Sequence, residues 1–218
     1  MTDWAEHAQR EQERYRDGET RLPDAADPDA RQRQLTRMGN AAAGAGLALV
    51  MQGSTEDARE WFDIACARYR ESWDDAPPGS WGRLIAILKA RILAGDWEGA
   101  ERDAVWTLEQ EADDAESPIG RYAAALAHAV RGDWAAVRVH ADALRTHEGF
   151  PKDVGDALAT LAAHDVVGYT EAVESVLESF DTRVEYLEDL PAADTVLVLQ
   201  ALAARRGIAV ELESQLLP

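Results

Sequence analysis

The chain has 218 residues, 46% of them hydrophobic, and its 41 acidic residues against 22 basic ones give a formal net charge of -19. This length and hydrophobic content are ordinary for one globular domain with a sizeable core. The charge argues against nucleic acid as a partner, because a phosphate-binding surface needs a concentrated basic stripe and the sequence has none.

The acidic residues are spread along the chain, which predicts that they cover the solvated faces of helices. Lysine is nearly absent, with only Lys89 and Lys152. We expect such a surface in a halophilic cytoplasm, where salt screens the repulsion between carboxylates. An arginine-preferring bacterium of high GC content is the alternative explanation. Three arginines that fall seven residues apart are expected to pair with neighbouring carboxylates: Arg131, Arg138 and Arg145.

The first part of the chain, residues 1–27, is predicted to be a polar, mobile arm that docks only loosely on the domain. Its residues 3–17 have a helical but nearly all-polar pattern, and the prolines that follow break the structure. The start is charged rather than signal-like, and the longest uncharged run, 38–54, is too short and too rich in glycine to span a membrane. We therefore expect a soluble cytoplasmic protein whose single folded domain covers residues 28–218.

A long helix is predicted over residues 28–52, with Pro28 in its first turn behind Asp27. Three glycines thin this helix: Gly39, Gly44 and Gly46. Because each interior glycine costs about 1 kcal/mol relative to alanine, we expect another backbone to pass close to this segment. A phosphate-binding loop is not indicated, since no strand precedes the glycines and no P-loop lysine follows them.

Three times an apolar helical run stops at a glycine and restarts behind a capping residue, at Gly53-Ser54, Gly95-Asp96 and Gly132-Asp133. Each glycine can take the left-handed conformation that ends a helix, and the Ser or Asp side chain can accept hydrogen bonds from the first N–H groups of the next helix. The glycines are spaced by 42 and 37 residues, and a similar junction follows at Asp165. The pattern predicts an all-α fold of divergent tetratricopeptide-like antiparallel hairpins in a short solenoid.

Apolar residues recur with helical spacing along the rest of the chain. The further predicted helices span 55–74, 81–94, 97–112, 118–131, 134–147, 151–163, 169–187 and 192–206. Several alanines fall where paired helices must approach closely: Ala100, Ala104, Ala123, Ala124, Ala127 and Ala159. Strand-like alternation occurs only at 208–212, so the domain is predicted to end in an extended cap over residues 208–218.

The tryptophans near predicted turns receive two interpretations. Trp97 and Trp134 sit just inside repeat turns, where we expect each ring to pack over the end of the preceding helix. Another two tryptophans flank a Pro-Pro-Gly loop beside a pair of aspartates. Aromatic residues are enriched at binding hot spots, so the predicted partner-binding residues are Trp73, Asp74, Asp75 and Trp81.

The five histidines are scattered, at His7, His128, His140, His147 and His164. The spacing of His140 and His147 is about two helical turns, too far for the i, i+4 pair of a helical zinc site. Carboxylate pairs such as Glu109 and Asp113 are too common in this chain to be informative. Cys66 lies among apolar helix residues and is predicted to be a buried structural thiol. We therefore predict no catalytic residues, no metal and no cofactor.

The carboxyl end of the chain carries a family resemblance. After the helix predicted to end at Arg206, the segment from Gly207 to Pro218 has a hydrophobic stretch, Val-Glu and Glu-Ser pairs and a terminal Leu-Pro. This segment resembles the C-terminal region of the Immunity protein 49 family, which comprises all-helical proteins associated with bacterial polymorphic toxin systems. The upstream helix with Leu177-Glu178-Ser179-Phe180 is compatible with a family helix.

The resemblance implies a protein that binds and neutralises a cognate toxin without catalysis, and acidic charge would suit a basic nuclease toxin. From the residues alone, stacked helical hairpins usually bind proteins and seldom carry chemistry. The predicted function is therefore a non-catalytic protein-binding role of the immunity type. A general tetratricopeptide-like adaptor is the alternative, and a helical enzyme is a more distant one. No nucleic acid or membrane partner is expected, and self-association stays open.

Overall fold

The computed structural model describes residues 2–186 and 189–218, which form ten α-helices and two short 3-10 helices. The all-α class predicted from the sequence is confirmed for these residues. By its internal contacts the chain divides into two compact units, one holding the chain up to Ala94 and the segment around Leu190, the other holding Gly95–Val184 and Ala193–Leu217. The sequence predicts a single domain over residues 28–218.

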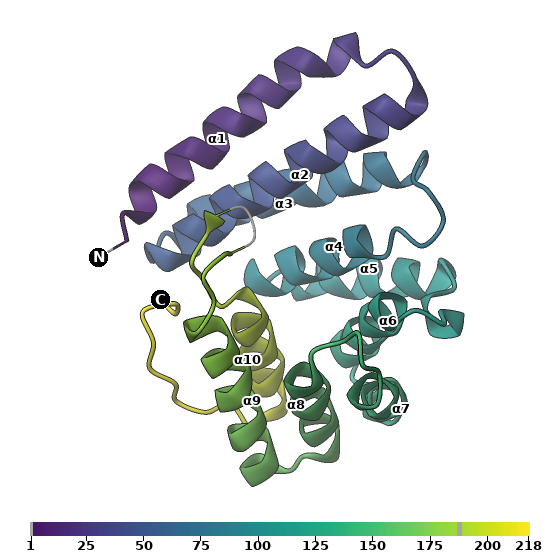
Figure 1. Ribbon diagram of the computed structural model, residues 1–218, viewed down its shortest axis with the longest axis vertical. Coiled ribbons are helices and arrows are strands. Elements are labelled where there is room, and N and C mark those ends of the chain that lie inside the picture. The colour runs from purple at the N-terminus through teal and green to yellow at the C-terminus, as the bar shows by residue number, and fades with distance from the viewer. Residues whose placement is uncertain (1, 187–188) are drawn as a thin grey trace. The chain divides into compact units, whose positions relative to one another are not determined.

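The first unit contains α1 (Trp4–Arg21), the 3-10 helix η1 (Leu22–Asp24), α2 (Pro28–Met51), α3 (Thr55–Trp73) and α4 (Gly82–Leu93). Within it α1 packs against α2, α2 against α3 and α3 against α4 (Figure 1). The second unit contains α5 (Trp97–Glu109), the 3-10 helix η2 (Ala112–Asp114), α6 (Pro118–Arg131), α7 (Trp134–Arg145), α8 (Lys152–Ala163), α9 (Val166–Asp181) and α10 (Asp194–Arg206). There too each α-helix packs against the next. Helix α9 begins at Val166 and ends at Asp181, so the helix predicted over 169–187 starts too late and extends too far; residues 182–186 are not helical, and residue 187 lies outside the described residues.

The polar arm predicted for residues 1–27 is largely the helix α1, which packs along α2. The Tyr15 side chain is buried, and its hydroxyl accepts a hydrogen bond from Nε of Arg68 in α3 at 3.0 Å. Glu11 is also fully buried, because the guanidinium groups of Arg10 and Arg14 pair with its two carboxylate oxygens. A few buried positions on one face are thus enough to hold a helix whose sequence is mostly polar.

Side chains from other segments, and not another backbone, lie against the glycines of α2. A Cβ atom added at Gly39 would lie 2.8 Å from the ring of Tyr69, and one added at Gly46 would lie 2.8 Å from the ring of Phe62. Both rings belong to α3. The close approach expected from the sequence is therefore real, but the neighbours at these two positions are aromatic rings and not another backbone.

The predicted glycine turns take the expected conformation. The φ angles of Gly53, Gly95 and Gly132 are 80°, 66° and 76°, all in the left-handed region. Capping differs between the turns: Asp96 and Asp133 accept hydrogen bonds from backbone N–H groups of the helices they precede, whereas the Ser54 side chain caps no N–H group of any described residue. Two of the glycines also bond back to the helix that they end, the Gly53 N–H to the Val50 carbonyl at 2.9 Å and the Gly132 N–H to the Ala129 carbonyl at 3.2 Å.

The predicted burial of the Cys66 thiol and of the close-approach alanines is confirmed. Cys66 is 2% exposed. The predicted close-approach alanines are all buried: Ala100, Ala104, Ala123, Ala124, Ala127 and Ala159. The stripe of arginines pairs with carboxylates, since Arg131 contacts Glu101 at 3.4 Å and Arg138 contacts Asp142 at 2.8 Å. Arg145 contacts the same Asp142 at 3.2 Å.

The carboxyl-terminal segment lies in an extended conformation against the second unit. Ile208 is 3% exposed, and the backbone carbonyl and N–H of Val210 both bond to the side-chain amide of Gln200 in α10. The same amide oxygen accepts a hydrogen bond from the hydroxyl of Tyr169 in α9 at 3.0 Å. Gln200 therefore joins α9, α10 and the terminal segment, which covers apolar surface without forming a strand.

Candidate functional site

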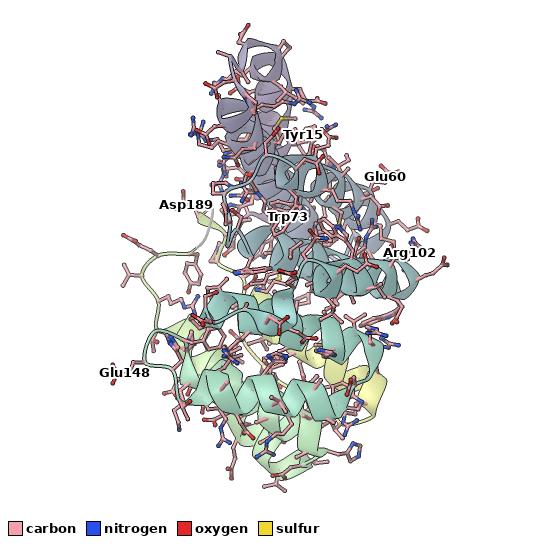
Figure 2. The ribbon with its side chains drawn as sticks, turned by 90° about the vertical axis from the view of Figure 1, so that its right-hand side faces the viewer. Tyr15, Glu60, Trp73, Arg102, Glu148 and Asp189 are labelled. Atoms are coloured by element: carbon pink, nitrogen blue, oxygen red, sulfur yellow. The ribbon has the colours of Figure 1, made fainter. Side chains whose placement is uncertain are left out.

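The predicted partner-binding residues lie on the turn between α3 and α4. Trp73 is the last residue of α3, and its ring lies 6.1 Å from the ring of Trp81 at a 44° angle between planes. Both rings are half-buried, while Asp74 and Asp75 are exposed. Figure 2 labels Trp73 among the side chains of this unit. The structure thus brings the two tryptophans into contact and leaves the acidic pair beside them in solvent.

The turn has a defined shape that holds the two rings in place. Gly79 has a φ of 80°, which an L side chain rarely adopts, so the chain reverses at this residue. The Ser80 hydroxyl donates a hydrogen bond to the Pro77 carbonyl at 2.6 Å. We call residues 73–81 the tryptophan turn.

Arg83 anchors the base of the tryptophan turn. Its Nε donates hydrogen bonds to Oγ of Ser72 at 2.9 Å and to Oγ1 of Thr36 at 3.2 Å, and its Nη2 donates to the buried amide oxygen of Gln32. Burial lowers the pKa of Arg83. Because the Arg83 side chain links α4 to both α2 and α3, it fixes the position of the helices on either side of the turn.

A second cluster of functional side chains lies in the other unit. Asp113, His128 and His140 come from η2, α6 and α7, and one carboxylate oxygen of Asp113 lies 2.7 Å from Nε2 of His128 and 2.9 Å from Nε2 of His140. The two imidazole rings stack with their centroids 5.7 Å apart and 17° between their planes. We call these three residues the histidine cluster.

Local structure explains how the histidine cluster forms. The hairpin turn at Gly132 makes α6 and α7 neighbours, so His128, near the end of α6, lies against His140 in the second turn of α7. Asp113 reaches them because Glu111 takes a left-handed φ of 63° and directs the chain into η2 before α6 begins. The cluster is thus built from a helical hairpin and the short connection that precedes it.

The electrostatics of the histidine cluster favour a neutral His140 next to an ionised Asp113. Burial lowers the pKa of His140, and its hydrogen bond to Asp113 offsets only part of this effect; the charges of His128 and Arg121 lower the pKa further. Burial raises the pKa of Asp113, but the hydrogen bonds from His128 and His140 outweigh it, so its pKa lies below the usual value. A neutral imidazole that donates a hydrogen bond is sufficient to stabilise the carboxylate.

Sequence reasoning missed the histidine cluster. Linear spacing compares His140 with His147, which share a helix, but the structural neighbour of His140 is His128 across the hairpin. The predicted Gly132 turn is the signal that pairs α6 with α7 and could have brought the two histidines together. No sequence signal places Asp113 there, because its position depends on the backbone of η2. His147 is exposed, and its Nδ1 accepts a hydrogen bond from the Gly149 N–H.

Comparison with known proteins gives no family for this chain. No protein-family model, curated protein or solved structure matches it significantly. The resemblance of the segment from Gly207 to Pro218 to the Immunity protein 49 family remains a hypothesis. None of the described helices combines the length and the apolar character needed to cross a membrane.

Proposed function

We propose that this chain is a non-catalytic protein-binding protein of the immunity type, which neutralises a cognate toxin by binding it in the bacterial cytoplasm. The observation that carries the proposal is the tryptophan turn, where two half-buried rings in mutual contact lie beside two exposed carboxylates. Large aromatic side chains dominate the energetics of protein interfaces, and rigid ones lose little conformational entropy on binding. The Arg83 base supplies that rigidity.

A tetratricopeptide-like stack of hairpins is the scaffold we propose for this role. Each helix within a unit packs mainly against its sequence neighbour, and tight glycine turns separate several of these helices. Packing of this kind is typical of helical-repeat proteins, whose outer residues are free to bind partners. In the proposed arrangement the extended segment after α10 packs on the last helices, where Ile208 is buried and Val210 bonds to Gln200.

The charge of the chain indicates the chemistry of the partner. With a net charge of -19, the surface attracts a basic protein, such as a cationic toxin, and complementary fields speed the encounter. In this mechanism Trp73 and Trp81 insert into an apolar depression of the toxin, and Asp74 and Asp75 pair with basic residues at its rim. Binding alone then blocks the toxin.

Capture from the native lysate tests this function. Tagged wild-type protein is expected to retain one stoichiometric toxin-like chain, identified by mass spectrometry. The double variant Trp73→Ala/Trp81→Ala should bind that chain at least about thirtyfold more weakly, because hot-spot truncations typically cost 2 kcal/mol or more. Trp4→Ala is the matched control, since Trp4 is half-buried at the start of α1, away from the turn in sequence, and it should bind as the wild type does.

Two outcomes would contradict the proposal. A double variant that keeps its helical circular dichroism and binds within twofold of wild type would show that the tryptophan turn is not the interface. Capture of many unrelated chains in place of one would favour the general adaptor.

We also propose that the acidic surface is adapted to a salt-rich cytoplasm. Glu60 in α3 and Glu148 in the connection between α7 and α8 are both exposed (Figure 2). Salt screens repulsion between such exposed carboxylates, so the thermal midpoint should rise between about 0.1 M and multimolar KCl. An unchanged midpoint by circular dichroism would favour the high-GC explanation of the composition.

A further inference from the structure

Three ligand-capable atoms converge in the histidine cluster. One ligand atom from each of Asp113, His128 and His140 lies within 4.8 Å of the other two, and both histidines face the same Asp113 oxygen through Nε2. The two histidine side chains are 9% and 7% exposed, whereas the side chain of Asp113 is 46% exposed. Two fixed imidazoles therefore lie inside the unit, and the carboxylate that faces both lies at its surface.

We propose that Asp113, His128 and His140 bind one Zn²⁺ ion through the two Nε2 atoms and the carboxylate, with water in the fourth position. Imidazole nitrogen together with carboxylate oxygen suits zinc, whereas Mg²⁺ and Ca²⁺ prefer ligand sets made of oxygen alone. Three protein ligands and one water form the set found in zinc sites that keep an open position. The site is independent of the tryptophan turn and of the function proposed for it.

The present distances require only a small adjustment to admit the ion. Zinc bonds of about 2.0–2.2 Å at tetrahedral angles separate ligand atoms by about 3.3 Å. The Asp113 oxygen now lies 2.7 Å and 2.9 Å from the two Nε2 atoms, so it must move outward by roughly half an ångström. Because Asp113 is half exposed and lies in the short η2, its carboxylate has room for this movement.

The unpaired Nδ1 atom of His128 also favours a metal ion. When both Nε2–H groups donate to Asp113, each Nδ1 becomes a bare acceptor, and both Nδ1 atoms are buried without a hydrogen-bond partner among the described residues. Leaving a buried polar atom unpaired is costly. Zinc replaces the Nε2 protons, so each neutral ring then carries its proton on Nδ1, and this N–H has a carboxylate near it at His128.

A second carboxylate is in position to support His128 in this protonated form. Oδ2 of Asp133 lies 3.7 Å from Nδ1 of His128, slightly beyond hydrogen-bonding distance. With the proton on Nδ1, a small shift completes a carboxylate–histidine–zinc arrangement, which fixes the ring orientation and strengthens the ligand. Asp133 is held near this point because its other oxygen caps α7 through the Ala136 N–H at 3.2 Å.

The test titrates the full chain with ZnCl₂ after dialysis against a chelator. Calorimetry should show one ion bound per chain. At a free zinc concentration one hundredfold above the Kd, the thermal midpoint should rise by about 5–10 °C and return when EDTA is added. CoCl₂ in place of zinc should give the visible absorption of tetrahedral Co²⁺ bound by nitrogen and oxygen.

Three variants locate the site. Asp113→Asn removes the anionic ligand but keeps an oxygen that accepts a hydrogen bond, and it should weaken zinc binding at least about tenfold. His140→Gln should abolish the cobalt absorption, and its circular dichroism in EDTA reports whether the fold is kept. His147→Gln is the matched control, because His147 is exposed and lies outside the cluster, and it should bind zinc as the wild type does.

The proposal is overturned by either of two results. Equal zinc affinity in wild type and Asp113→Asn would place the ion elsewhere on the acidic surface. The absence of both heat and a shift in thermal midpoint on zinc addition would leave the cluster as three hydrogen-bonded side chains without a metal.

Discussion

The guanidinium group of Arg206 lies over the ring of Trp134, with its carbon 4.2 Å from the ring centroid. Its Nη2 also donates a hydrogen bond to the carbonyl of Ala162, near the end of α8, at 2.9 Å. The preceding residue repeats the arrangement, since Arg205 lies 4.3 Å over Trp97 and bonds to the carbonyl of Val130 near the end of α6. Each of these two consecutive arginines of α10 thus contacts a tryptophan ring and also bonds to a backbone carbonyl near the end of another helix. The packing of each ring over the end of its preceding helix stays a prediction. The arginine over Trp97 bonds to the end of α6, and the arginine over Trp134 bonds to the end of α8.

Replacing Arg206 with alanine should lower the free energy of unfolding by about 1–3 kcal/mol. The change removes a charge-assisted hydrogen bond to a helix end and a half-buried cation–π contact. Urea denaturation followed by circular dichroism measures the loss. Arg183→Ala is the control, because Arg183 lies 3.7 Å over Phe180 but is exposed; it should cost less than about 1 kcal/mol. Equal costs for both variants would show that the bond to Ala162 contributes nothing.

Adding a methyl group to α2 should destabilise the first unit. In Gly46→Ala the new Cβ atom would lie 2.8 Å from the ring of Phe62, which must move. Overpacking of this kind costs about 1–3 kcal/mol, and the better helix propensity of alanine offsets up to about 1 kcal/mol. Chemical denaturation should therefore show a net loss. Gly82→Ala, where no atom lies within 4 Å of the added Cβ, is expected to be neutral or stabilising; a gain in Gly46→Ala would contradict the close packing.

Two residues that look alike as helix caps should respond differently to alanine. Asp165 accepts a hydrogen bond from the Gly168 N–H at 3.0 Å, whereas Ser54 makes no such bond to any described residue. Asp165→Ala should cost about 1 kcal/mol of unfolding free energy and Ser54→Ala only a few tenths. Equal losses in parallel denaturation curves would mean that Ser54 caps α3 in solution.

Local features of this fold could be predicted from the sequence because the physical causes are local. Gly53, Gly95 and Gly132 end helices through their own conformational freedom, and the capping aspartates act on N–H groups two or three residues away. The same reasoning places Asp165 at a junction, although His164 takes the left-handed conformation there with a φ of 57°. The buried alanines follow from helical periodicity.

The histidine cluster and the arginine–tryptophan contacts could not be predicted in this way. The Gly132 turn indicates that α6 packs on α7, but the path of η2, which brings Asp113 to His140, follows no spacing along the chain. Arg205 and Trp97 are far apart in sequence. In a chain with 41 acidic residues, an arginine could equally be expected to pair with a carboxylate. The docking of α1 was missed for a related reason, since Tyr15 and a buried Glu11 give little periodic signal in a polar helix.

Loss of stability in alkali should depend on Tyr169. Burial raises the pKa of its hydroxyl far above the usual value of 10.0 in the folded chain, while the unfolded chain ionises near that value. The unfolded state therefore loses a proton first, so the contribution of Tyr169 is fully present below pH 10 and is lost as the pH rises further. Urea unfolding measured between about pH 9 and pH 11 should show this decline.

Tyr169→Phe should be less stable than wild type at neutral pH by about 1 kcal/mol, because the bond to Gln200 is lost. Its stability should also decline less steeply above pH 10. An identical slope in both proteins would mean that Tyr169 ionises in the folded state.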